Sequence, residues 1–325
     1  MDLTTTYMGL KLKNPIIVSS NILTANIEDI KKCAEKGAGA IVLKSLFEEQ
    51  LLSDPSKLET YDHKYYYFPE AVDYINQYAK GKGVKQYLNL IEEAKKNTDV
   101  PIIASINCIT DKEWPEFAKN LEKAGADGLE LNIAIIPFSE EMDCREIEKR
   151  YVGIVSEVKK HINIPLAVKM GSYFTNPVLI AKRIIEAGAD SLVIFNRFFR
   201  PDIDINAEEI TAENYLSAPE EITKPMRWVS ILKGRLNCQI AAGTGIHTAE
   251  GVIRQILAGA DATQICSTLH INGISYIETM LERMKTWMEE KGYNSIEEFK
   301  GKMIEDQQNF ASFMRVQFMK RNIEE

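Results

Sequence analysis

Short apolar runs alternate with longer amphipathic stretches along almost the whole chain. Nearly all of these runs are unbroken and end in a polar residue, as expected for parallel strands that are covered on both faces. They lie at residues 15–20, 40–45, 101–107, 128–132, 165–170, 191–196, 238–242 and 262–267. Eight such strands are the number that closes a barrel.

A helix, a glycine turn and a strand recur four times in the same order. The copies read CAEKGAGAIVLKS, LEKAGADGLELN, IIEAGADSLVIFN and ILAGADATQICS. This alternation predicts a parallel sheet with right-handed crossovers. The alternative is a doubly wound open sheet, but no G-x-G-x-x-G follows the first strand and Gly243-Thr244-Gly245 lacks the third glycine. We therefore expect one α/β domain over residues 1–325, a (β/α)8 TIM barrel.

Two long connections predict loop insertions at the carboxyl end of the strands. Residues 47–100 carry acidic residues and the aromatic cluster 65–68, and residues 197–227 show no clear periodicity. Long loops at this end commonly form lids or partner surfaces. The aromatic cluster could stack on a ring or could pack the insertion onto the barrel rim. Residues 304–325 predict a C-terminal helical extension, exposed to solvent or at an interface.

Residues 240–269 predict two consecutive strand-to-helix turns that are rich in small and hydroxyl residues. Gly243, Thr244 and Gly245 follow the seventh strand, and Ser267 and Thr268 follow the eighth. Backbone N–H groups and the positive end of a helix dipole favour an anion at such turns. In (β/α)8 barrels the common phosphate site follows strands seven and eight. Two ordinary turns are the alternative, but the presence of both halves together favours a phosphate cradle.

Composition narrows the class of protein. The chain has 325 residues, 45% of them hydrophobic and 26% charged, with a net charge of -8, which argues against a nucleic-acid or membrane-surface partner. No apolar run approaches the roughly 18 residues of a membrane span, and the N-terminus lacks a secretion signal. Five cysteines without close pairing indicate reduced thiols and a cytoplasmic location. No cluster has metal-ligand spacing, so no metal is expected.

Lysines and asparagines end several predicted strands, where barrel enzymes carry their chemistry. Lys44 and Lys169 end apolar strands, and a lysine there is costly unless an anion meets it. Asn132 and Asn196 add amide donors and acceptors. Together with the cradle, these groups favour flavin mononucleotide (FMN), with a lysine near flavin N1 and amides at the ring edge. Two alternatives stay open: the lysines pair with a barrel carboxylate such as Glu130, or Lys169 forms a Schiff base as in an aldolase-type barrel.

The sequence resembles the dihydroorotate dehydrogenase family, most of all its soluble class 1 members, over nearly its whole length. The motifs that carry the resemblance are MDLTTTYMGLKLKNPIIVSSN, VLKSL, LELN, LAVKM, VIFN, LSAP, GTGI, ICSTL and MEEKGYNSIEEFKGKM. The resemblance implies that the following residues contact FMN, a set to which we add Asn107 because it ends a predicted strand: Ser19, Ser20, Lys44, Ser45, Asn107, Asn132, Lys169, Ser217, Gly243, Thr244, Gly245, Ser267 and Thr268. It also implies substrate contacts from Lys44, Asn132 and Asn196, and a homodimer.

The substrate half of the pattern departs from that family. The family pattern N-L-S-C-P-N carries the class 1 base, whereas residues 132–138 read NIAIIPF, with neither Cys nor Ser. An isoleucine cannot accept a proton, so Ser139 and Cys144, just downstream, are the candidates for the base; a surface turn and a structural thiol are the alternatives. The N-S-M-G-L-P-N substrate loop is missing, and Arg197 stands where a small hydroxyl residue is usual. Ala218 replaces a glycine in LSAP.

We therefore expect an FMN-dependent oxidoreductase that acts on a CH–CH donor by hydride transfer to flavin N5. Its substrate would be dihydroorotate or a related cyclic amide, in pyrimidine biosynthesis if the family reaction is kept. One alternative is a non-redox phosphate-binding barrel, an aldolase or isomerase that uses Lys169. Another is a flavin-binding homologue without dihydroorotate turnover. No iron–sulfur cysteine pattern identifies the electron acceptor, and a partner subunit could supply a cluster or a second flavin.

Overall fold

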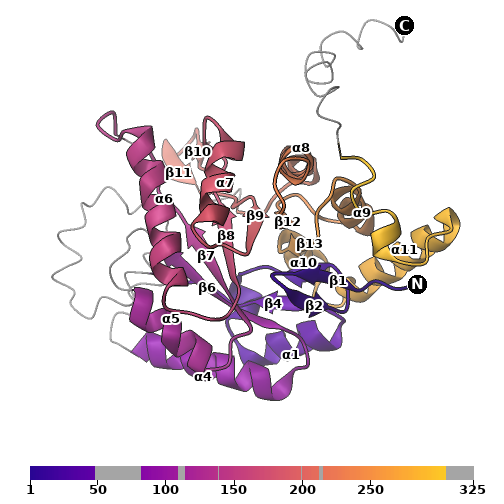
Figure 1. Cartoon of the computed structure of the whole chain (residues 1–325). Helices are drawn as coiled ribbons and strands as arrows, with labels where there is room; N and C mark the ends of the chain where they lie inside the picture. The colour runs from indigo at the N-terminus through magenta and orange to yellow at the C-terminus, as the bar shows by residue number, and fades with distance from the viewer. Residues whose placement is uncertain (48–81, 109–113, 138, 199, 212–214, 305–325) are drawn as a thin grey trace, which may run out of the picture.

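Eight parallel strands close into a barrel in the computed structural model, which describes residues 1–47, 82–108, 114–137, 139–198, 200–211 and 215–304 (Figure 1). The barrel strands are β3 (Ile16–Val18), β4 (Ala40–Val42), β6 (Ile102–Cys108), β7 (Gly128–Ile133), β8 (Leu166–Met170), β9 (Ser191–Ile194), β12 (Gln239–Gly243) and β13 (Ala262–Ile265). Each strand pairs with the next in parallel, β4 pairs with β6, and β13 returns to β3. The predicted (β/α)8 barrel is confirmed.

Helices cover the outside of the barrel between the strands (Figure 1). They are α1 (Ile27–Glu35), α4 (Lys82–Asn97), α5 (Trp114–Lys123), α6 (Cys144–Lys159), α7 (Pro177–Glu186), α8 (Thr223–Lys233), α9 (Ala249–Leu257), the short α10 (Ser267–Asn272) and α11 (Tyr276–Lys291), with 3-10 turns η1 (Ile22–Thr24), η4 (Pro219–Ile222) and η5 (Ile296–Glu298). The glycines that follow the helices of the four repeats all have positive φ: Gly37 95°, Gly125 96°, Gly188 113° and Gly259 107°. Only glycine adopts this conformation at little cost, so the repeat marks true helix ends.

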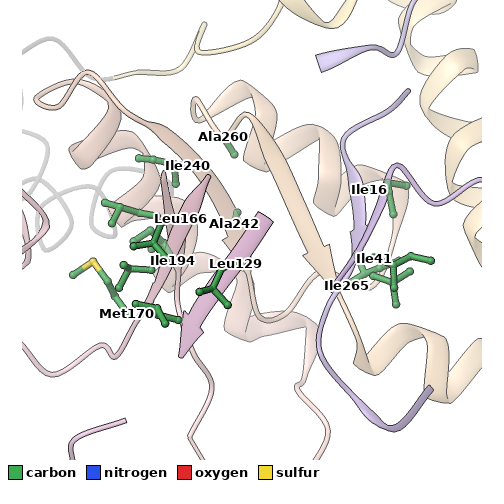
Figure 2. Close-up of a cluster of buried hydrophobic side chains, with 14 of the residues drawn as sticks. Ile16, Ile41, Leu129, Leu166, Met170, Ile194, Ile240, Ala242, Ala260 and Ile265 are labelled. Atoms are coloured by element: carbon green, nitrogen blue, oxygen red, sulfur yellow. The ribbon is translucent and has the colours of Figure 1, made fainter. Parts of the chain in front are cut away.

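Apolar side chains fill two layers because successive residues of a strand point to opposite sides of the sheet. Outward-facing residues, such as Leu129 and Ile240, are fully buried against the helices (Figure 2). Inside the barrel a smaller cluster packs against Tyr7 of the hairpin β1 (Thr5–Tyr7)–β2 (Leu10–Leu12). The hairpin closes the amino-terminal end of the barrel, so polar groups are left to gather at the other end.

The observed strands are mostly shorter than the apolar runs that predicted them. The run at 40–45 gives a strand that ends at Val42, and the run at 262–267 gives one that ends at Ile265, because Ser267 already begins α10. Hydrophobic runs report burial, and burial continues for a few residues after the regular strand has ended. The polar residues at the run ends therefore lie on loops and helix starts above the barrel.

The two predicted insertions contain barrel elements as well as additions. In the first, α4 is an ordinary barrel helix and β5 (Leu46–Phe47) pairs with β6; residues 48–81, with the aromatic cluster 65–68, lie outside the described residues. The second contains the hairpin β10 (Asp202–Asp204)–β11 (Glu209–Thr211) and η4 before α8. The predicted extension 304–325 also lies outside the described residues, except for residue 304. No helix in the described part of the chain could cross a membrane.

Candidate functional site

A cavity lies at the carboxyl-terminal end of the barrel, and we call it the barrel cavity. It is lined by Ser19, Ser20, Lys169, Phe195, Asn196, Arg197, Tyr215, Ser217, Gly243, Thr244, Gly245, Ile246, Gln264, Cys266 and Ser267. These residues come from or directly follow β3, β8, β9, β12 and β13, or precede η4. The structure thus brings together most of the residues that the sequence assigned to a flavin.

Hydroxyl and backbone N–H groups cluster in one part of this cavity. Ser217 N–H donates to Ser267 Oγ at 2.9 Å, and the two hydroxyl oxygens are 3.0 Å apart. Gly245 N–H points to Ser217 Oγ at 3.4 Å. Thr268 is fully buried behind them and donates to the carbonyl of His247 at 2.9 Å. Groups of this kind at strand and helix ends are typical of anion sites, and we call this group the hydroxyl cluster.

The turn at Gly245 is built for close approach of two backbone segments. Its φ is 75°, and a Cβ added there would lie 2.2 Å from the backbone nitrogen of Ile222. Thr244 also has a positive φ, 77°, which a β-branched residue rarely adopts. Thr244 Oγ1 donates to the carbonyl of Phe195 at 3.3 Å. The turn therefore holds η4 and the preceding Ser217 against the end of β12.

Lys169 projects from β8 into the barrel interior and is only 8% exposed. Its ammonium group donates to Gln264 Oε1 (2.8 Å), Glu130 Oε1 (3.1 Å) and Ser19 Oγ (3.2 Å). The pairing with Glu130, an alternative at the level of sequence, is thus present, and Lys169 lines the barrel cavity as well. A Schiff-base lysine must offer its amine to a substrate carbonyl, whereas the amine of Lys169 is held by three protein acceptors. The geometry therefore disfavours the aldolase hypothesis.

Glu130 is the most deeply buried member of this group, with 1% of its surface exposed. It stands on β7 two residues before Asn132, and therefore on the same, inward face of the strand. Gln264 Nε2 donates to its second oxygen, Oε2. Burial and, after it, the charge of Glu130 raise the pKa of Tyr7 well above 10 at the closed end of the barrel. The phenol therefore stays protonated.

Three asparagines lie at one level of the barrel. Asn107 of β6 pairs in register with Asn132 of β7, which pairs in register with Lys169 of β8. Asn196, just after β9, donates from Nδ2 to Asn132 Oδ1 at 2.8 Å and lines the barrel cavity. Asn107 and Asn132 are half-buried. Amides arranged in this way can hydrogen-bond the edge of a planar polar ligand.

Three serines form a chain of hydroxyl groups that leads from the barrel cavity into the wall of the barrel. Ser20 Oγ lies 3.0 Å from Ser45 Oγ, which lies 2.8 Å from Ser105 Oγ. Ser20 lines the cavity, whereas Ser105 is fully buried. Ser45, which the motifs assign to the cofactor, does not itself line the barrel cavity, but its backbone N–H donates to Ser20 Oγ at 2.8 Å.

Lys44 lies apart from Lys169. It lines a second cavity, together with Ala25 and residues of α4 such as Gln86 and Glu93. The sequence placed both lysines at one cofactor, but of the two only Lys169 lines the barrel cavity. The reason is that β4 ends at Val42, so Lys44 belongs to the segment that leaves the sheet towards β5 and is not held by the ladder.

The two candidates for a proton-accepting group lie at the start of α6. Ser139 Oγ accepts the N–H of Glu141 at 3.3 Å, and Cys144 is the exposed first residue of α6, after the N-cap Asp143. Neither lines the barrel cavity. Ile135, near the position where the family carries its base, is buried in the outer apolar layer. Ser139 and Cys144 thus have the roles of a turn residue and a helix-start residue in this structure.

Arg197 gives the rim of the barrel cavity a positive charge. Its Nε lies 3.1 Å from Glu221 Oε2, and Arg200 Nη2 lies 2.8 Å from the same oxygen. Burial acts to raise the pKa of Glu221, but the N–H of Ala218 and the two guanidinium groups outweigh it and hold that pKa below its usual range. Two cations on one carboxylate leave a net positive charge, which favours an anionic ligand.

His247 supports the hydroxyl cluster from behind. It is 8% exposed, and its Nε2 lies 3.1 Å from Ser217 Oγ. Burial lowers the pKa of His247 below 6.5, and the hydrogen bond with Ser217 and the charges of Glu221 and Glu220 oppose this only in part. The folded protein therefore favours the neutral imidazole.

This burial predicts a pH dependence of stability. Below its ordinary pKa of about 6.5 the unfolded chain binds a proton at His247 that the folded protein resists, so stability is lost as the pH falls through that value. We expect His247→Gln to flatten the dependence of melting temperature on pH between about pH 7.5 and about pH 5. His161→Gln, at the end of α6, is the reference for losing a histidine elsewhere. If H247Q and wild type gave the same profile, the buried neutral imidazole would be refuted.

Among the residues of the site that were not singled out from the sequence are Ser105, His247, Gln264 and Cys266. Strand periodicity carried a signal for two of them, because Gln264 shares the inward face with Ala262, as Ser105 does with Asn107. His247 and Cys266 lie in the two turns that the sequence identified. The sequence could not show which residues these four contact in the folded barrel, because no local pattern reports distances across it.

The fold is a (β/α)8 barrel in which hydroxyl and N–H groups after the seventh and eighth strands line the same cavity as a buried lysine. The family model of dihydroorotate dehydrogenase matches residues 2–288. A protein of Thermoplasma volcanium named dihydroorotate dehydrogenase B (NAD(+)), catalytic subunit, is 28% identical over 319 residues, which cover 93% of this chain and 99% of that protein. A protein of the same name from Methanocaldococcus jannaschii is 29% identical over 309 residues, covering 92% and 97%.

The chain therefore belongs to the dihydroorotate dehydrogenase family. Its relatives are oxidoreductases that act on CH–CH donors, and the resemblance inferred from the motifs is confirmed.

Proposed function

We propose that this protein binds FMN in the barrel cavity and uses it to oxidise a CH–CH donor of the dihydroorotate type. The observation that carries the proposal is that the hydroxyl cluster and Lys169 line one cavity. FMN has a phosphate at one end and a planar, polar ring at the other. A ligand of this shape uses both features at once, whereas a simple phosphate ester would use the hydroxyl cluster alone.

The residues present fit this cofactor. Ser217, Ser267 and the backbone of Gly245 offer donors for a phosphate. A Cβ added to Gly245 would lie 2.2 Å from the Ile222 nitrogen, so there is no room for a side chain at that position. Lys169 and Asn196 offer donors for the edge of the ring. When bound, FMN would supply the hydride acceptor.

The chain's own residues would bind and orient the two reactants. Lys169 would place a positive charge beside the ring, since its ammonium group is held by three acceptors. Asn132 and Asn196, joined at 2.8 Å, would present one amide face to the substrate. Arg197 would attract an acidic group of the substrate to the rim of the barrel cavity.

The substrate would be dihydroorotate or a related cyclic amide. Removing a proton from such a substrate needs a base within hydrogen-bond reach. Ile135 is buried in the outer apolar layer, and neither Ser139 nor Cys144 lines the barrel cavity. None of these three residues presents a proton acceptor to the barrel cavity, so related cyclic amides are included among the proposed substrates. A flavin-binding homologue without dihydroorotate turnover is the alternative outcome of the test below.

A partner subunit would carry the electrons away. The relatives from Thermoplasma volcanium and Methanocaldococcus jannaschii are named as catalytic subunits of an enzyme that uses NAD(+). By analogy, we propose that this chain works with a second kind of subunit. The homodimer implied by the motifs remains part of the proposal, as the core to which such a subunit would bind.

Anaerobic mixing with L-dihydroorotate tests the proposed reaction. The flavin-loaded protein is followed near about 450 nm, where the oxidised ring absorbs and any hydride transfer must register. We expect bleaching within the mixing experiment if the family substrate is kept. A yellow protein that bleaches with no dihydropyrimidine would contradict oxidation of this class of donor, and a protein that takes up no flavin would contradict the cofactor itself.

A further inference from the structure

A buried ion pair in the barrel interior has a consequence for the flavin. We propose that Glu130 is a positioning residue that fixes Lys169 and offsets the positive charge that Lys169 presents to the bound ring. The inference rests on the proposed function, because it concerns the same cavity and the same cofactor. It assigns to Glu130 a role in setting the midpoint potential of the flavin.

Three acceptors occupy the ammonium group of Lys169, and they come from different strands. Glu130 stands on β7 and Gln264 on β13, while Ser19 follows β3. An ammonium group has three N–H donors, so every one of them has a protein acceptor. The bond to Ser19 is the longest, 3.2 Å, and Ser19 lines the barrel cavity. A flavin that bonds to Lys169 would therefore replace Ser19 and leave the other two acceptors in place.

Gln264 joins the pair across the barrel. In the order β3, β4, β6, β7, β8, β9, β12, β13, the strands β7 and β13 lie on opposite sides, yet Gln264 Nε2 donates to Glu130 Oε2 while its Oε1 accepts from Lys169 at 2.8 Å. Glu130 and Gln264 are 1% and 3% exposed. The side chain of Lys169 is thus held by a rigid, dry frame, which fixes both its position and its counter-charge.

The sign of the effect follows from the charges. A lysine beside the ring favours the reduced form of the cofactor, which carries more negative charge than the oxidised form. A carboxylate 3.1 Å from the same ammonium group opposes this, and it does so through a low-dielectric interior where water screens little. The pair as a whole is neutral. The potential should therefore lie below the value that Lys169 alone would give.

The test is the midpoint potential of FMN bound to the full-length protein, measured by equilibration with a dye of known potential. We expect Glu130→Gln to shift the balance towards reduced flavin at least tenfold, which is about 30 mV upwards for a two-electron couple. Asp127→Asn is the matched control. Asp127 immediately precedes β7 and pairs with Lys95 at 2.7 Å outside the barrel. The flavin potential of D127N should therefore stay at the wild-type value.

Two further variants keep the proposal testable if E130Q fails to fold. Lys169→Gln should lower the potential, and the double variant K169Q/E130Q, which removes both charges of the pair, should return close to the wild-type value. A potential in E130Q equal to wild type, or a double variant as low as K169Q alone, would overturn the role of Glu130. Failure of the wild-type protein to bind FMN would instead overturn the proposed function, so the two failures are distinct.

Discussion

Replacing Lys169 by methionine is expected to lower the free energy of unfolding by about 3–5 kcal/mol, because it leaves Glu130 as an unpaired charge in the barrel interior. Glu130 is 1% exposed and would keep only the hydrogen bond from Gln264. The same change removes the Lys169 cation from the barrel cavity, so the folded variant should also bind FMN more weakly. Urea unfolding followed by circular dichroism measures the first effect.

A second ion pair provides the control for Lys169→Met. Lys95 and Asp127 are 2.7 Å apart, but their side chains are 33% and 26% exposed, so Lys95→Met should cost no more than about 1 kcal/mol. The double variant K169M/E130Q should recover part of the loss, since it removes both charges. Equal losses in K169M and K95M would contradict the view that the barrel interior holds a desolvated ion pair.

Replacing Gly245 by alanine is expected to damage both the fold and the anion site. The new Cβ would lie 2.2 Å from the nitrogen of Ile222, and the alanine would have to adopt a φ of 75°. The strain of a left-handed alanine costs about 1–2 kcal/mol, and the collision adds to it by pushing η4 away from the turn. Because Ser217 lies just before η4, the hydroxyl cluster would open, and FMN affinity should fall at least tenfold, about 1.4 kcal/mol.

Gly292 separates strain from collision in this comparison. It has nearly the same φ, 73°, but nothing lies within 4 Å of an added Cβ. Gly292→Ala should therefore show only the cost of strain, in thermal unfolding, and no change in FMN binding. If G245A lost no more stability than G292A and bound FMN equally well, the close approach of the two segments would have no part in the site.

The barrel itself was predictable because its signals are local and repeated. Eight apolar runs and four glycine-terminated helices each report burial or a helix end within about a dozen residues, and together they specify a closed parallel barrel. Strand lengths were overestimated for a physical reason. Leu43 follows the end of β4 and stays fully buried, and its N–H still donates to the carbonyl of Ile103 at 2.9 Å, so the apolar run extends past the regular strand.

The hydroxyl cluster was predictable in part. Gly245 and Ser267 meet because they follow β12 and β13, and consecutive strand ends lie side by side in such a barrel. Ser217 joins them from the loop before η4, and only its motif pointed to it. The partners of Lys169 depend instead on distances across the interior, and Gln264 reaches Glu130 from the opposite side. Lys44, which its motif assigned to the cofactor, follows the end of β4 and lines the second cavity, so its contact with a cofactor stays a prediction. Local sequence carries no information on distances across the barrel interior.

The most direct test of the central claim compares FMN with riboflavin, which has the same ring and no phosphate. Titration of the protein freed of any bound flavin, followed by quenching of flavin fluorescence, gives both dissociation constants. Charge-assisted hydrogen bonds to the hydroxyl cluster are worth roughly 1.5–3 kcal/mol each, so FMN should bind at least about a hundredfold more tightly than riboflavin. Equal affinities for the two, or no binding of either, would contradict an FMN site with its phosphate at Ser217, Gly245 and Ser267.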